Sequence, residues 1–72
     1  MGDVGSRIKD IRDAYGCTQK EFAERMLISQ PYLSYLENGT KEPTKRFIRL
    51  FCLEFKVNEK WILEGEGKVF TE

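Results

Sequence analysis

The feature that most constrains the fold is a pair of helix start signals placed close together near the middle of the chain. Thr18 and Glu21 match a Thr-x-x-Glu capping box, in which each side chain satisfies a free backbone N–H of the other residue. Ser29 can cap a second helix, and Pro31 stands in its first turn, where a missing N–H costs nothing. These signals predict two short helices joined by a tight turn, over residues 19–26 and 30–37.

Apolar side chains recurring at helical spacing predict three further helices around this pair. The predicted spans run from Val4 or Arg7 to Tyr15, from the cap Thr44 to Phe55, and from the cap Asn58 to Gly65. The middle one of these has the most regular stripe, formed by Phe47, Ile48, Phe51, Cys52 and Phe55. A chain of 72 residues has room for one small domain. We therefore expect an all-α, five-helix domain over residues 1–67 and a short C-terminal tail over residues 68–72.

The composition argues against catalysis and against a bound metal. The chain has no His, which removes the usual general base and the commonest metal ligand. Its two cysteines, Cys17 and Cys52, are far apart, as expected for reduced core residues of a cytoplasmic protein. The sequence has no Gly-rich phosphate loop, signal peptide or transmembrane run. We therefore expect no enzymatic activity, no cofactor, no metal, no small-molecule ligand and no membrane partner.

The chain has equal numbers of basic and acidic residues, but they are not evenly distributed along the sequence. Twelve Lys and Arg residues oppose twelve Asp and Glu residues, and a net charge of zero is a mild argument against a nucleic-acid partner. Within residues 18–49, however, six basic residues outnumber four acidic ones. The basic excess coincides with the predicted helix pair, and the second helix of such a pair can enter the DNA major groove.

Several short motifs along most of the chain are similar to those of one known family. They are Thr18-Gln19-x-Glu21-Phe22-Ala23, then Ile28-Ser29-Gln30-x-Tyr32-Leu33-x-x-Leu36-Glu37-Asn38-Gly39, and then Pro43, Val57 and Trp61-Ile62-Leu63-x-Gly65-Glu66-Gly67. Together they resemble the Cro/phage-repressor (Xre-type) helix-turn-helix family of bacterial and phage transcription regulators, over roughly residues 6–67. The resemblance implies a lambda-repressor-like DNA-binding domain in which helices two and three form the helix-turn-helix. An oligomerisation domain often follows in this family, at the position of the tail from Glu66.

The resemblance also implies which residues contact DNA. Gln19 would meet a phosphate at the N-terminus of the second helix, where the helix dipole favours an anion. Gln30, at the start of the third helix, would reach a base edge, because its amide suits the N7 and N6 atoms of adenine. Tyr32 and Tyr35 would touch a thymine methyl or a phosphate, and Asn38 and Lys41 would contact the DNA backbone. The full set is Gln19, Gln30, Pro31, Tyr32, Ser34, Tyr35, Asn38 and Lys41.

Comparison with the family pattern also points to an ion pair and to an unusual turn residue. Arg12 and Glu37 match residues that form a buried structural ion pair in the family, which ties the first helix to the third. Leu27 stands in the turn between helices two and three, where the family usually has Gly. A left-handed conformation there costs a bulky residue roughly 1–2 kcal/mol.

The predicted fourth helix departs from the family pattern on its outer face. Leu50 and Leu53 stand where the family usually has polar residues, and they lie one turn apart, off the core stripe. We expect them to form an exposed apolar patch, with Val57 or Phe70 as candidate additions, that serves dimerisation or partner docking.

Two functions remain open on the sequence alone. The resemblance implies sequence-specific binding of double-stranded DNA by a small transcriptional regulator, acting as a homodimer. The alternative is a protein-interaction module, antitoxin-like or adaptor, on the same scaffold. Zero net charge, Pro31 and the two tyrosines of the third helix favour the alternative, and the third helix has no Arg or Lys for a guanine contact. Lys45 and Arg46 would reach phosphate only if the first function holds.

Overall fold

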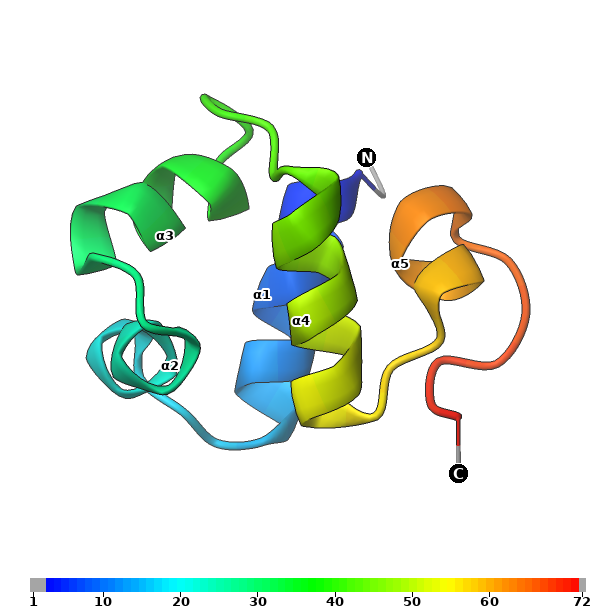
Figure 1. The fold of residues 1–72 in the computed structure, drawn as a ribbon. Helices are drawn as coiled ribbons and strands as arrows, with labels where there is room; N and C mark the ends of the chain where they lie inside the picture. The colour runs from blue at the N-terminus through cyan, green and yellow to red at the C-terminus, as the bar shows by residue number, and fades with distance from the viewer. Residues whose placement is uncertain (1–2, 72) are drawn as a thin grey trace.

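Five α-helices follow one another in a computed structural model that describes residues 3–71. They are α1 (Val4–Ala14), α2 (Gln19–Met26), α3 (Gln30–Glu37), α4 (Lys45–Phe55) and α5 (Glu59–Glu64). The described residues form no β-strand beyond an isolated bridge, so the predicted all-α fold is confirmed. In Figure 1, α4 stands at the centre, with α2 and α3 on one side of it and α5 on the other. None of these helices is both long and apolar enough to span a membrane.

Each helix follows an N-cap residue whose side chain accepts a hydrogen bond from a backbone N–H of the first turn of that helix. The five caps are Asp3, Thr18, Ser29, Thr44 and Asn58. The predicted capping box of α2 is complete, with both of its reciprocal hydrogen bonds present. Caps of this kind contribute about 1 kcal/mol each, which matters for a domain whose short helices could not persist alone.

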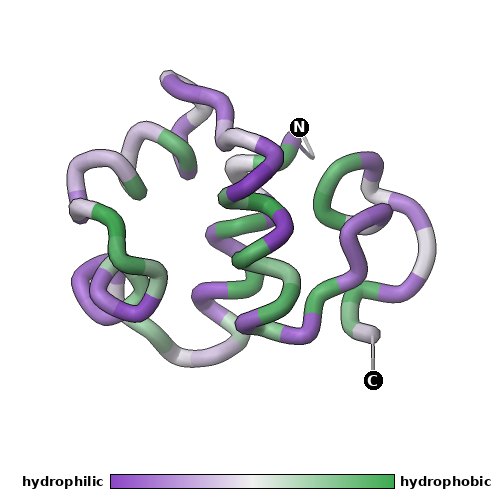
Figure 2. The backbone as a smooth tube through the Cα atoms, viewed as in Figure 1, coloured by the Kyte–Doolittle hydropathy of each residue, from purple (hydrophilic) through white to green (hydrophobic). Residues whose placement is uncertain are grey.

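The core is built around a cluster of phenylalanines between α2 and α4. Phe22 stacks on Phe55 with ring centres 5.0 Å apart, and Phe51 lies 5.8 Å from Phe22 and 5.4 Å from Phe55. All five residues of the predicted α4 stripe are buried, and Figure 2 shows hydrophobic and hydrophilic residues alternating along that helix. Cys52 belongs to this stripe, and burial raises the pKa of its thiol to about 11. Cys17 is half-buried against the same core.

The chain after α5 turns back onto the segment between α4 and α5. The Asn58 N–H donates to the Val69 carbonyl at 2.8 Å, and the Thr71 N–H donates to the Lys56 carbonyl at 2.9 Å. Val57 and Phe70 form an isolated antiparallel bridge between these bonds. Residues 68–71, expected as a tail, therefore pack on the domain, and residue 72 lies outside the described residues.

The expectation that Val57 extends the exposed leucine patch is wrong. Its side chain is only 2% exposed, because the antiparallel bridge folds the chain end over it. Phe70 is half-buried, with its ring centre 6.3 Å from that of Tyr15. Any exposed patch on α4 therefore rests on Leu50 and Leu53, which are 50% and 68% exposed.

The turn between α2 and α3 depends on one residue in the left-handed conformation. Leu27 has φ 59° and ψ 41°, and its side chain is 91% exposed. The Ile28 N–H reaches back to the Ala23 carbonyl at 2.9 Å, which closes α2. Leu27 therefore takes up the strain of a left-handed backbone without burying its side chain in return.

We expect Leu27→Gly to stabilise the domain by about 0.5–1 kcal/mol, because relief of the left-handed strain exceeds the extra backbone entropy of glycine in the unfolded chain. Urea unfolding would show a higher midpoint with an unchanged slope. Leu53→Gly is the matched control, since it removes another exposed leucine from a helical backbone and should destabilise by about 1 kcal/mol. A loss of stability in both variants would show that the turn is unstrained.

Candidate nucleic-acid interface

One face of α3 packs inward, and the other faces away from the core. Leu33 and Leu36 are buried, whereas Gln30, Pro31 and Tyr35 are exposed. Figure 1 shows α3 at the edge of the molecule, where no other helix covers its outer side. A short helix held at the edge, with polar and aromatic side chains turned outward, has the form needed to enter a groove of a partner.

Tyr32, one of the residues expected to contact DNA, is only partly exposed, and its side chain packs against the core. It lies one helical turn before Leu36 and next to Leu33, so it borders their apolar stripe. Ser34 is likewise only partly exposed.

A buried ion pair fixes the C-terminal end of α3 to α1. Arg12 Nε lies 2.7 Å from Glu37 Oε2, and Arg12 Nη2 lies 3.2 Å from Glu37 Oε1. Only 11% of the Arg12 side chain and 5% of the Glu37 side chain are exposed. The hydrogen bond to Glu37 raises the pKa of the Arg12 guanidinium above its ordinary value. Arg12 Nη1 also donates to the Cys17 carbonyl at 2.9 Å, so the same side chain holds the segment that leads into α2.

The backbones of α1 and α3 also approach each other closely next to this pair. Gly5 is buried in the first turn of α1, and a Cβ placed on it would collide with the carbonyl oxygen of Leu36. The absence of a side chain at Gly5 therefore lets α1 reach the last turn of α3, beside Glu37.

Two glutamines continue the network from Glu37 to the start of α3. Gln19 Nε2 donates to Glu37 Oε1 at 3.0 Å, and Gln30 Nε2 reaches Gln19 Oε1 at 3.5 Å. The second bond is at the long limit for a hydrogen bond and is therefore weak. Gln19, expected at a phosphate, thus also engages its amide within the protein. The result is a chain of polar contacts from the buried Arg12 to the exposed Gln30.

The loop after α3 places a cation beside the tyrosines. Lys41 Nζ lies 5.9 Å from the ring centre of Tyr32 and 5.5 Å from that of Tyr35. The Lys41 backbone N–H also donates to the Tyr35 carbonyl at 3.2 Å. Asn38 caps α3, and its Oδ1 accepts from the Thr40 N–H at 2.9 Å. Lys41 therefore supplies the positive charge that α3 itself lacks, held in part by cation–π attraction.

The structure thus gathers the predicted residues into two groups at one edge of the domain. One group joins Gln19 and Gln30 to the ion pair, and the other joins Tyr32 and Tyr35 to Lys41. The contact between the glutamines was not predicted from the sequence. Each glutamine directly follows a helix cap, which places it in the first turn of its helix. That local signal does not show that the two first turns are neighbours.

Comparison with known proteins agrees with the two short helices and the turn described above. A family model described as a helix-turn-helix domain matches residues 5–68. Over 68 residues, 94% of this chain, the sequence is 38% identical to antitoxin PezA of Streptococcus pneumoniae, of which the match covers 42%. Over 65 residues, 90% of this chain, it is 35% identical to the propionyl-CoA carboxylase regulator of Cereibacter sphaeroides, of which the match covers 14%. The chain therefore spans less than half the length of either relative.

Breaking the buried ion pair should cost far more than breaking an exposed pair of the same length. We expect Glu37→Gln to destabilise the domain by about 3 kcal/mol, because the largely buried Arg12 guanidinium then keeps only the exposed Asp13, 3.6 Å from its Nη1, as a counter-charge. Glu54→Gln is the control, since Arg25 Nε lies 2.7 Å from Glu54 Oε2 but the two side chains are 42% and 44% exposed. That change should cost less than about 1 kcal/mol in the same urea titration. Equal losses would contradict a special role for the buried pair.

Proposed function

The chain belongs to the helix-turn-helix domain family, and on that premise we propose that it is a small transcriptional regulator that binds double-stranded DNA sequence-specifically. The third helix, α3, would lie in the major groove. The observation that carries the proposal is the exposed Gln30 at the start of α3, joined through Gln19 to a buried ion pair. A binding role of this kind requires no catalysis or cofactor. We also propose that the protein acts in the cytoplasm.

Gln30 is the residue that we propose reads a base. Its amide carries both a donor and an acceptor, and these match the N6 and N7 atoms of adenine at the major-groove edge. In the free protein its Nε2 is tied only by a long bond of 3.5 Å to Gln19, which costs little to exchange for a base. Tyr35 and the exposed part of Tyr32 would add contacts to a thymine methyl or a phosphate.

The remaining residues of the face would position the domain on the DNA backbone. Gln19 lies in the first turn of α2, whose free backbone N–H groups attract a phosphate. Asn38 and Lys41 lie just past α3, on the side from which a flanking phosphate would be reached. These contacts would fix the register of α3 in the groove but would not read sequence.

Few cations are available to such a complex, so its salt dependence should be modest. With about four phosphates neutralised by each copy, the slope of log K against log salt would be about −4 for each copy bound. We propose that two copies bind as a homodimer to palindromic half-sites about one helical turn apart, since a two-fold protein pair mirrors such a site.

A second candidate function is an antitoxin-like or adaptor module that binds another protein through the same face. Two observations favour it: one relative is named an antitoxin, and α3 carries an exposed Tyr35 but no Arg or Lys. Exposed aromatic residues are also enriched at protein interfaces. The two functions differ in what they require of DNA, so one selection experiment separates them.

The purified chain should enrich a palindrome or a short half-site when it is used to select from random duplex DNA at near-physiological salt. The base preference follows from the Gln30 amide, and the symmetry of the recovered site would report the dimer. Sequencing of the selected pool is the measurement. If no sequence is enriched and binding is also absent at low salt, the DNA proposal is wrong and the protein-binding alternative stands.

On the selected site, Gln30→Ala and Lys41→Ala should act in different ways. Gln30→Ala should cost about 1–3 kcal/mol and relax preference at one base pair, because it removes the pairing amide. Lys41→Ala should weaken binding to all sequences alike and reduce the salt slope by about 1. Lys9→Ala, an exposed change on α1, is the control and should alter neither quantity. Titrations against matched and single-mismatch duplexes at several salt concentrations would measure both effects.

A further inference from the structure

The outer side of α4 bears a groove that lies apart from the glutamines, the tyrosines and Lys41 of the proposed DNA contacts, although Lys45 and Arg46, candidates for a phosphate contact, line it. It has a volume of about 790 Å³ and is lined by Val4, Glu42, Pro43, Lys45, Arg46, Ile48, Arg49, Leu50, Leu53, Glu59 and Leu63. We call this surface the α4 groove. None of these residues belongs to α2 or α3, so the groove is separate from the glutamines and tyrosines described above.

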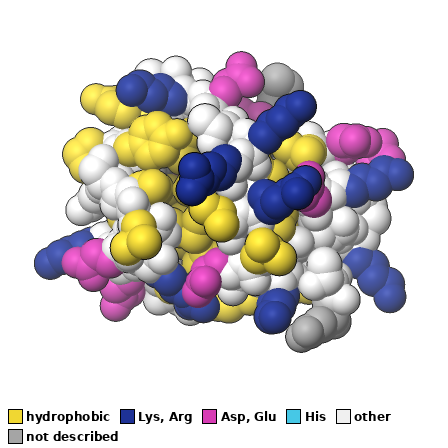
Figure 3. Space-filling view, viewed as in Figure 1, with side chains coloured by type: hydrophobic (Ala, Val, Ile, Leu, Met, Phe, Trp, Pro, Cys, Tyr) yellow, Lys and Arg dark blue, Asp and Glu magenta, His cyan; other side chains and the backbone are white. Residues whose placement is uncertain are grey.

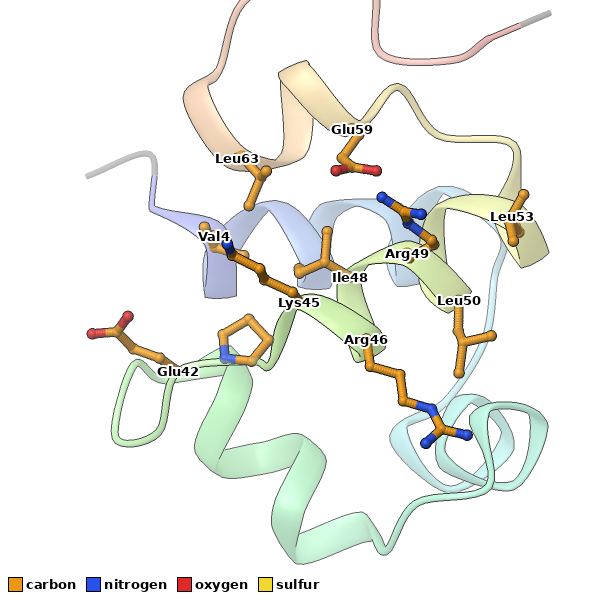
Figure 4. A pocket seen from close by; sticks show the side chains of 11 residues that line it. Val4, Glu42, Lys45, Arg46, Ile48, Arg49, Leu50, Leu53, Glu59 and Leu63 are labelled. Carbon is orange, nitrogen blue, oxygen red and sulfur yellow. The ribbon is translucent and has the colours of Figure 1, made fainter.

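The α4 groove concentrates exposed apolar surface. Leu50, Leu53 and Leu63 line it, and they are three of the six large hydrophobic side chains that are exposed among the described residues. Figure 4 shows Val4 and Leu63, from α1 and α5, turned toward Ile48 of α4. Ile48 itself is buried, so the exposed apolar surface of the groove consists of Leu50 and Leu53 on α4, with Leu63 of α5 and the partly exposed Val4 of α1 beside them. Exposed leucines grouped around one groove are typical of an interaction site.

Cations outnumber carboxylates by one, three to two, among the residues that line the α4 groove. Lys45, Arg46 and Arg49 project from α4 along the groove, and within residues 3–71 none of their side chains has an ion-pair or hydrogen-bond partner. Two carboxylates, of Glu42 and Glu59, also line it, which leaves the cations in excess. In Figure 3, Lys and Arg side chains stand among hydrophobic ones on the face over α4.

The cations lie on both sides of the helix. Figure 4 shows Lys45 and Arg49 extending from α4 toward α5, whereas Arg46 extends on the side of α2 and α3. A segment lying along α4 would therefore meet leucines beneath it and a cation at either flank. Such an arrangement suits an amphipathic helix whose apolar side chains enter the groove and whose flanks carry carboxylates.

From this combination we propose that the α4 groove is a docking site for an acidic amphipathic helix of a partner protein. The leucines supply the apolar contact, and Lys45, Arg46 and Arg49 select for carboxylates on the flanks. A second copy of this chain is the competing occupant, because a two-fold interface could set the α4 cations of one copy against Glu42 and Glu59 of the other. Self-association is therefore one of the outcomes that the test must separate.

The probe is a fluorescein-labelled synthetic peptide of about four helical turns, with Leu at i, i+3, i+4 and i+7 and Glu on both flanks. A peptide with the same leucines and Lys in place of every Glu is its counterpart. By fluorescence anisotropy we expect the Glu peptide to bind at least about tenfold more tightly than the Lys peptide, with an affinity that falls as salt is added.

Two double variants test the two chemical parts of the groove. Arg46→Glu with Arg49→Glu should weaken binding of the Glu peptide about tenfold and strengthen that of the Lys peptide. Leu50→Ser with Leu53→Ser should weaken both peptides. Lys9→Glu with Lys68→Glu makes the same charge change at exposed positions outside the groove, and should alter neither affinity. All substituted positions are exposed, and unchanged thermal unfolding of each variant would establish that its fold is intact.

Three outcomes would overturn the proposal. Equal binding of the Glu and Lys peptides would mean that the groove has no charge preference. Self-association of the chain in sedimentation, abolished by the double leucine variant, together with no peptide binding, would assign the groove to a second copy. Displacement of the Glu peptide by duplex DNA, with loss of DNA binding in the double arginine variant, would assign the cations to nucleic acid.

Discussion

The rest of the domain is arranged around the buried ion pair of Arg12 and Glu37. A buried charge is tolerated only when it is paired and hydrogen-bonded, and each partner here makes more than one contact. Arg12 joins α1 to the segment before α2, and Glu37 joins the end of α3 to the beginning of α2. Three helices are thereby held at one polar point. The angle at which α3 is presented follows from that point.

Much of the fold could be predicted because its signals are local. The caps Thr18, Ser29, Thr44 and Asn58 and the α4 stripe each depend on residues a few positions apart, and each lies where the pattern indicated. Contacts between segments that are distant in the sequence could not be predicted in this way. Nothing in the sequence marks Gly5 as the point where α1 meets the backbone of α3, because a glycine within a predicted helix does not show whether another backbone packs against it. The burial of Val57 also depends on a chain end that was expected to be only a short tail.

The candidate sites differ in the same way. The residues of the α3 face were identified from motifs, and the structure adds how they are connected: a glutamine pair on one side, and a lysine over two rings on the other. Tyr32 shows the limit of helical periodicity, since a residue at the border of an apolar stripe packs or points outward according to its neighbours. The α4 groove needed three-dimensional information, because Val4, Ile48 and Leu63 come from helices that are far apart in the sequence.

The return of residues 68–71 onto the segment between α4 and α5 has a practical consequence for handling the molecule. In Figure 1 these residues lie on the side of the domain opposite α3. Backbone hydrogen bonds of 2.8 and 2.9 Å anchor them there. A surface tether or a fluorescent label attached after residue 71 would therefore be joined to the domain on the side opposite α3. Immobilised in this way, the protein would keep the face of α3 open to solution.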